Sequence, residues 1–503
     1  MTLLERPVPS IERPAVGRRR AVLALARTEA RRLLSHPLVV VAMTTYVALT
    51  VWRAAGAVGH PVLQDVGRET QYGPLFVGLA GLVAANSAVL RARRHRTEAQ
   101  FGVLVVTAWQ RNTAHSLSTL PLALAVAVIV AGQFTREAMR PGAVGHASFA
   151  ELVTGPLVVV LLGVLGVLLG RLVRSSFAGP LAVLVLLTVQ LSLSVTTSGW
   201  RWLAPIAIDE SELPLPADLV GRPANWHALY LVGLALLAGA GASLLSGGRS
   251  GPVRGTALVA LAGTLVGAVA QGAGPSEALV EARARATGDP AAAQVCVRRD
   301  VTTYCAFPDF TPWIDEWQAI TEEVRAVSGA PAATRELTVR QRVDALDGLT
   351  GVHDLPPGPP GEVTASTAWG GERRLEFAAS VARGLVADDE ADRGARCGGQ
   401  GIVIMWLAIR ATPDGEAEFA RTQARVHGGG AVILAPVRSV TVPDREFAVL
   451  RALLDEPTEQ VARRVEASWA ELTAPATSTD RAAELLGVPV RAETAADREW
   501  GCV

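Results

Sequence analysis

Four cysteines carry the most specific chemistry that this 503-residue sequence offers, and all of them lie in its C-terminal half. Cys296 and Cys305 flank only eight residues, which favours a hairpin closed by a disulfide, worth roughly 2.5–3 kcal/mol in the chain-entropy model. Cys397 and Cys502 would form a second pair. A zinc site is the rival interpretation, but the Cys-x-x-Cys spacing is missing and no histidines cluster nearby.

Catalytic motifs are missing. All 47 basic residues are arginine, so no P-loop lysine, Schiff-base lysine or Ser-x-x-Lys pair can form. There is no His-Glu-x-x-His or Gly-x-Ser-x-Gly, and only His353 and His427 follow residue 273. We therefore predict that the chain is not an enzyme, with no catalytic residue, no bound metal and no cofactor.

Two acidic groups have alternative interpretations. The run Asp388, Asp389, Glu390 and Asp392 could bind Ca²⁺, but a solvated acidic loop is the simpler explanation. The group at 209–212 could serve an enzyme that acts on lipid or cell-wall precursors. The topology described next explains that group equally well.

The composition divides the chain into an apolar and a polar part. Half of the residues are apolar, mean hydropathy is +0.30, and only 19% of residues are charged. The net charge of zero implies no attraction to nucleic acid. We predict an α-helical multi-pass membrane domain over 37–272, followed by an α+β domain over 273–503. Apolar runs of about 20 residues predict seven spans: 37–58, 73–90, 117–134, 152–172, 178–197, 227–246 and 255–272.

Arginine predicts the sidedness of these spans. The first apolar run begins too late, and is too long, for a cleaved signal peptide. With the N-terminus inside, the inner segments hold seventeen arginines and the outer loops before residue 273 hold five. Cytoplasmic loops carry such an excess. We therefore expect a plasma-membrane protein in the lipid bilayer, with its N-terminal tail in the cytoplasm and residues 273–503 on the oxidising, extracytoplasmic side.

Few polar side chains lie inside the spans. Arg53 is near an interface and can snorkel. Asn86 and Gln190 are either hydrogen-bonding contacts between helices or, less simply, substrate ligands. The lack of intramembrane carboxylates disfavours proton- or ion-coupled transport. Glycines at short spacing predict close helix packing, and they include Gly163, Gly166, Gly170, Gly263 and Gly267.

Two basic segments at the cytoplasmic side have an amphipathic pattern. Residues 18–34 place Leu23, Ala26, Ala30 and Leu33 on one helical face, which predicts a helix at the membrane interface or simply a charged flank. Residues 91–116 form a long inner loop with its own apolar stripe. Such a stripe can dock into a groove on a cytoplasmic partner.

This arrangement resembles the permease subunits of type-2 ATP-binding-cassette (ABC) exporters. Residues 18–34 resemble the family's elbow helix, and the 91–116 loop resembles the coupling helix that is seated on the ATPase. The resemblance assigns the ATPase contact to Arg96, Thr97, Glu98, Phe101, Leu104 and Arg111. It implies a separate cytoplasmic ATPase and pairing of permease subunits as a homodimer or heterodimer. Trp109, the seventh span and the large outer domain depart from the family pattern.

The sequence Leu245-Ser246-Gly247-Gly248-Arg249 looks like the signature of an ABC ATPase. It follows an apolar span, and no phosphate-binding loop precedes it. We interpret it as coincidence.

The outer domain combines strand-like and helical patterns. Strands are predicted over 294–306 and 400–410, helices over 311–327, 375–386 and 447–472, and a turn or linker over 354–361. Trp313 and Trp317 share a helix face and predict core packing, with an aromatic ligand platform as the alternative.

The leading hypothesis is a transport subunit, an exporter driven through the 91–116 loop. A membrane-anchored extracytoplasmic binding or sensing protein is the second hypothesis, and a membrane enzyme is the third.

Overall fold

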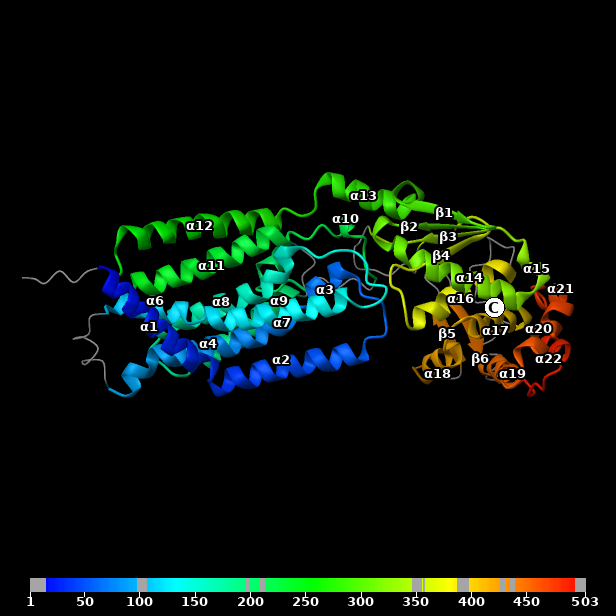
Figure 1. The fold of residues 1–503 in the computed structure, drawn as a ribbon, viewed down its shortest axis with the longest axis horizontal. Helices are drawn as coiled ribbons and strands as arrows, with labels where there is room; N and C mark the ends of the chain where they lie inside the picture. The colour runs from blue at the N-terminus through cyan, green and yellow to red at the C-terminus, as the bar shows by residue number, and fades with distance from the viewer. Residues whose placement is uncertain are drawn as a thin grey trace, which may run out of the picture.

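The computed structural model describes residues 15–96, 106–194, 199–208, 213–345, 355, 358–386, 398–425, 430–434 and 439–493. A helical bundle and a C-terminal domain follow one another along the long axis of the molecule (Figure 1). Helix α1 (Ala15–Leu34) lies at the end of the bundle farthest from the C-terminal domain.

The bundle is built from long apolar helices, as predicted. Among the described residues, six helical segments are long and apolar enough to cross a membrane. They contain α2 (Pro37–Gly56), α4 (Tyr72–Arg94), α7 (Leu120–Ala138), α8 (Phe149–Leu172), α11 (Ala224–Leu244) and α12 (Gly251–Gly272). Six such segments define a multi-pass membrane protein.

The predicted span 178–197 is described as far as Ser194. Its described part is helix α9 (Ala178–Ser194), a shorter apolar helix than the other six, and residues 195–197 lie outside the described part of the chain. Helix α9 runs along the bundle, and α1 and the C-terminal domain lie at opposite ends (Figure 1).

Short elements connect the long helices. They are α3 (Leu63–Glu69), α6 (Ala108–Leu117), η1 (Gly199–Leu203), α10 (Ala217–Val220) and α13 (Glu277–Gly288). Helix α8 packs against α4, α7 and α11, and it is the most buried helix of the bundle. Helix α2 buries only Val39 and Tyr46, so most of its apolar surface is left uncovered.

The C-terminal domain holds a four-stranded mixed sheet in the order β1-β2-β3-β4. Strands β1 (Val295–Arg299) and β2 (Thr302–Ala306) are antiparallel, and β3 (Leu337–Gln341) and β4 (Glu362–Ala365) continue the sheet in parallel. The predicted strand 294–306 is therefore a hairpin that turns at Asp300, whose φ is +50°. A second hairpin joins β5 (Gly430–Leu434) to β6 (Ser439–Pro443).

Helices form most of the remaining domain. They include α14 (Ile314–Ser328), α16 (Glu372–Val386), α17 (Gly398–Ala411), α19 (Asp444–Leu454) and α20 (Thr458–Ala467). Shorter elements are η2 (Pro290–Ala293), η3 (Pro308–Trp313), α15 (Ala330–Ala333), α18 (Gly415–Arg425), α21 (Trp469–Leu472) and α22 (Thr479–Leu486).

The strand predicted over 400–410 is wrong, because these residues form α17. Nearly every residue of α17 is buried, and α14, α16, α19 and α22 surround it. A helix buried on all sides has no polar face, so its sequence cannot be told from that of a buried strand by periodicity. The helices predicted over 311–327 and 375–386 are confirmed. The one over 447–472 is helical but interrupted at Pro457, which cannot continue a helix.

Candidate functional sites at the two ends of the bundle

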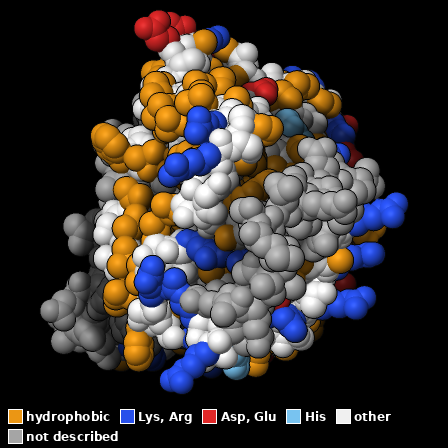
Figure 2. Space-filling model, turned by 90° about the vertical axis from the view of Figure 1, so that its left-hand side faces the viewer, with side chains coloured by type: hydrophobic (Ala, Val, Ile, Leu, Met, Phe, Trp, Pro, Cys, Tyr) orange, Lys and Arg blue, Asp and Glu red, His pale blue; other side chains and the backbone are white. Residues whose placement is uncertain are grey.

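We define the arginine-rich end as the end of the bundle that carries α1, the C-termini of α4 and α8, and the start of α6. Figure 2 looks onto this end, where arginine side chains outnumber acidic ones. The charge distribution expected from the sequence is thus gathered on one face of the folded molecule.

Glu29 is the centre of this end. Its side chain is only 6% exposed, and its carboxylate accepts hydrogen bonds from Arg91 at 3.0 and 3.1 Å and from Arg32 at 2.9 Å. His115 of α6 lies 4.0 Å from the same carboxylate. One buried charge therefore links α1 to the C-terminus of α4 and to α6. A buried carboxylate is tolerated when it is paired in this way.

Helix α6 is also held in place near its N-terminus. Thr107 and Gln110 form a capping box, which satisfies backbone N–H groups at the helix N-terminus. The buried Asn112 side chain donates to Ala242 O at 2.9 Å and accepts from Arg171 Nε at 2.8 Å. These bonds hold α6 against α8 and α11.

The residues assigned to the ATPase contact fall between Arg91 and Asn112 in the sequence. Arg96 ends the α4 region in the left-handed conformation, with φ +54°, and Arg111 on α6 donates to Val106 O at 3.1 Å. Thr97, Glu98, Phe101 and Leu104 fall outside the described residues. The structure therefore places the two ends of the loop and leaves the contact itself a prediction.

The LSGGR sequence, residues 245–249, directly follows the last residue of α11. Gly247 has φ +85°, and Gly248 N–H donates to Ser243 O at 3.0 Å, which is a helix-capping pattern. Local backbone geometry accounts for these glycines.

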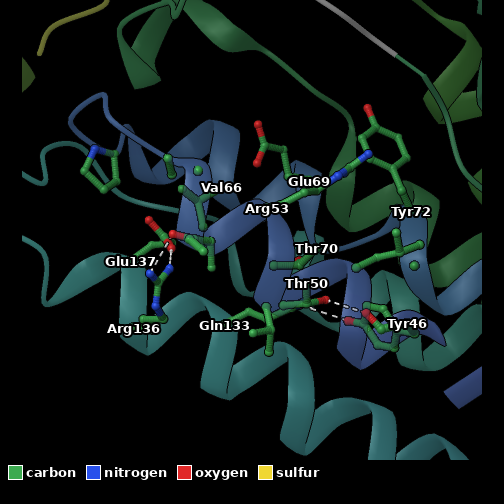
Figure 3. A pocket seen from close by; sticks show the side chains of 18 of the residues that line it. Tyr46, Thr50, Arg53, Val66, Glu69, Thr70, Tyr72, Gln133, Arg136 and Glu137 are labelled. Carbon is green, nitrogen blue, oxygen red and sulfur yellow. Dashed lines mark hydrogen bonds and ion pairs between the residues drawn. The ribbon is translucent and has the colours of Figure 1, made fainter. Parts of the chain in front are cut away.

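A groove of about 1620 Å³ lies toward the end of the bundle that faces the C-terminal domain. It is formed between α2, α3, α4 and α7, next to the C-terminal domain. The part of the groove farther from the C-terminal domain is apolar. It is lined by Val41 and Val47 from α2, Phe76 and Leu79 from α4, and Ile129 from α7. Polar and charged side chains line the part nearest the C-terminal domain (Figure 3). The groove is thus apolar along most of its length and polar at the end next to the C-terminal domain.

Tyr46, Thr50 and Gln133 form a hydrogen-bonded chain where the two parts meet (Figure 3). Tyr46 donates to Gln133 Oε1 at 2.9 Å, and Gln133 Nε2 donates to Thr50 Oγ1 at 2.6 Å. The bonds tie α2 to α7. Gly73 of α4 makes room for the Tyr46 ring, because a Cβ at position 73 would lie 2.1 Å from it.

Charged side chains make up the polar end of the groove. Glu137 pairs with Arg136 and, at 2.7 Å, with Arg140, while Arg140 also donates to Ala57 O and Gly59 O. Arg53 and Glu69 lie within electrostatic reach of each other. Neither side chain makes a hydrogen bond or a direct ion pair with any other described residue.

The C-terminal domain contacts the bundle at the polar end of the groove. His60 Nε2 lies 2.7 Å from Glu316 Oε1, and Trp369 Nε1 and Arg374 Nη2 each donate to Glu316 Oε2 at 2.9 Å. These contacts, that with His60 foremost, lower the pKa of Glu316 to about 2. We call Glu316, His60, Trp369 and Arg374 the junction cluster. A backbone bridge between Gly59 and Gly370 and a bond from Trp313 Nε1 to Gly142 O at 2.8 Å reinforce it.

The other predicted polar and aromatic residues have structural roles or remain without a partner. Gln190 exchanges hydrogen bonds with Ile206, as expected for an internal contact. Asn86 is buried, and its side chain has no hydrogen-bond partner among the described residues. Trp313 and Trp317 are both buried in the core of the C-terminal domain, which confirms core packing.

The first cysteine pair forms the predicted disulfide. Cys296 and Cys305 are direct cross-strand partners in the β1–β2 hairpin and are bonded. Cys397, Cys502 and the acidic runs 209–212 and 388–392 lie outside the described residues. Within the described part of the chain, no group of three His, Cys, Asp or Glu side chains could hold a metal ion.

Sequence patterns did not predict the groove, because its residues come from several segments that are far apart in the chain. One signal was available: Tyr46, Thr50 and Arg53 recur every three to four residues, which places them on one face of a span. Comparison with protein-family models, with curated proteins and with solved structures finds no match for this chain.

Proposed function

We propose that this chain is the transmembrane permease subunit of an ABC exporter, driven by a separate cytoplasmic ATPase that docks on the 91–116 loop. The observation that carries the proposal is the packing of α1 on α4 and α6 through Glu29. The described ends of the 91–116 loop, on α4 and α6, are both tied to α1, an arrangement suited to transmit force from a partner to the bundle.

The sidedness belongs to the same proposal. The arginine-rich end would face the cytoplasm and the C-terminal domain the outside of the plasma membrane, by the positive-inside rule. The Cys296–Cys305 disulfide supports an oxidising location for the C-terminal domain. The uncovered apolar faces of α2, α9 and α12 are suited to lipid and to a second permease subunit, identical or different.

The test is co-purification from the native membrane with the neighbouring genes intact. The tagged wild-type chain is expected to bring down an ATPase subunit and ATP hydrolysis. The double variant Phe101→Asp, Leu104→Asp is expected to lose both, because two carboxylates cannot enter an apolar groove without a large desolvation cost.

The matched control is Phe101→Leu, Leu104→Met, which keeps the apolar stripe and should retain the ATPase. If neither wild type nor control brings down an ATPase while the chain stays folded, the permease proposal is wrong. The alternative is then a membrane-anchored extracytoplasmic binding or sensing protein, which the junction of the C-terminal domain with the groove would serve.

A further inference from the structure

The groove beside α2 has the dimensions of a site for a membrane amphiphile. Small-molecule pockets usually measure roughly 300–1,000 Å³, and this groove reaches about 1620 Å³. Its lining follows α2 from Leu38 to Val51, about 20 Å at 1.5 Å per residue. Val41, Val47 and Phe76 in this lining are 64%, 40% and 58% exposed in the chain alone. An apolar chain would cover them.

The polar end of the groove holds two opposite charges that are not joined. Arg53 is exposed to the groove from α2, and Glu69 is exposed to it from the end of α3 (Figure 3). Glu137, by contrast, already has partners in Arg136 and Arg140. An unpaired guanidinium next to an unpaired carboxylate is complementary to a headgroup that carries one negative and one positive charge.

Arg68 adds an independent sign of a missing partner. Its side chain lines the groove, yet the residue is only 9% exposed. Its Nε and Nη1 atoms have no hydrogen-bond acceptor among the described residues, and the nearest carboxylate, Asp65, lies 4.0 Å from Nη2. Buried guanidinium groups are almost always hydrogen-bonded, because the unpaired group carries its full desolvation cost. A phosphate oxygen would supply the acceptor.

We propose that this groove binds a membrane phospholipid whose headgroup carries a phosphate and a primary ammonium group. Arg53 and Arg68 face the phosphate, Glu69 faces the ammonium, and the acyl chains lie along the apolar wall of α2, α4 and α7. The site is at the opposite end of the bundle from the 91–116 loop, so this proposal stands or falls independently of the ATPase.

The full-length chain, purified in mild detergent and stripped of lipid, is mixed with equal amounts of three lipids that share the same acyl chains. Their headgroups are phosphoethanolamine, phosphocholine and phosphoglycerol, and bound lipid is counted by native mass spectrometry. We expect phosphoethanolamine lipid to exceed phosphoglycerol lipid about tenfold, which corresponds to about 1.4 kcal/mol. Glu69→Gln should remove that preference, and Arg53→Gln should lower the binding of all three.

Three further variants and one ligand complete the test. Val47→Trp should reduce lipid binding by filling the apolar wall, whereas Glu323→Gln and Arg285→Gln, on exposed surfaces of α14 and α13, should leave it unchanged. The proposal is overturned if wild type shows no headgroup preference, or if Arg53→Gln and Glu69→Gln bind like wild type. Soluble glycerophosphoethanolamine binding as tightly as the lipid would overturn the assignment of the apolar wall.

Discussion

Individual glycines decide how closely the helices of the bundle approach. A Cβ at Gly166 would lie 2.3 Å from the carbonyl oxygen of Leu82, and one at Gly267 would lie 2.8 Å from the backbone nitrogen of Tyr230. These positions confirm the packing role predicted from glycine spacing. Gly263 differs, because a Cβ there would make only ordinary contact, 3.6 Å from Leu229.

Gly166→Ala is therefore expected to destabilise the protein by about 1–3 kcal/mol, the usual cost of overpacking. The cost arises because the contact is with backbone of α4, which cannot rotate away. The thermal midpoint in detergent measures it. Gly255→Ala on α12 is the matched control, since a Cβ at position 255 would meet nothing within 4 Å and alanine favours helix. Equal midpoints for both variants would contradict the argument.

Among the helices, α1 is held by charge as well as by apolar contact. Three residues of the face predicted from the sequence, Ala26, Ala30 and Leu33, are buried, but the fourth, Leu23, is 58% exposed. Glu29 lies on the same buried side and pairs with Arg91. The arginines of α1 at positions 27 and 31 remain exposed, as the amphipathic pattern requires.

Glu29→Gln should loosen α1 from the bundle. The amide has no charge, so it leaves Arg91 and Arg32 with weaker acceptors, and hydrogen bonds to charged groups contribute about 1.5–3 kcal/mol each. We expect about tenfold faster hydrogen–deuterium exchange over 18–34. Glu281→Gln, an exposed residue of α13, should leave exchange unchanged. Unaltered exchange in Glu29→Gln would mean that apolar contacts alone hold α1.

Across the two parts of the molecule, the junction cluster fixes the C-terminal domain over the groove. Contacts to Glu316 lower its pKa from 4.5 to about 2. A carboxyl whose pKa is depressed in the folded state stabilises that state above its unfolded pKa, and the contribution is lost as pH falls through the folded value. The junction should therefore keep its full stability above pH 4.5 and weaken between pH 4.5 and 2.

Glu316→Gln should remove this acid-dependent step. Near-ultraviolet circular dichroism follows the change, because Trp313, Trp317 and Trp369 are packed together at the junction. Wild type is expected to change between pH 4.5 and 2, and Glu316→Gln is expected to lack that component. Glu323→Gln, on the exposed side of α14, serves as control. A variant with the wild-type acid profile would show that the step belongs to other groups.

The membrane character, the approximate helix positions and the Cys296–Cys305 hairpin could all be predicted from the sequence. Each of these follows from local information: run length, charge at run ends, and the short distance between two cysteines. The helix over residues 400–410 could not be predicted, since a segment buried on every side has no periodic signal. The groove likewise emerged only on folding, because Arg53, Arg68 and Gln133 come from separate segments, and no local pattern specifies which faces of packed helices meet.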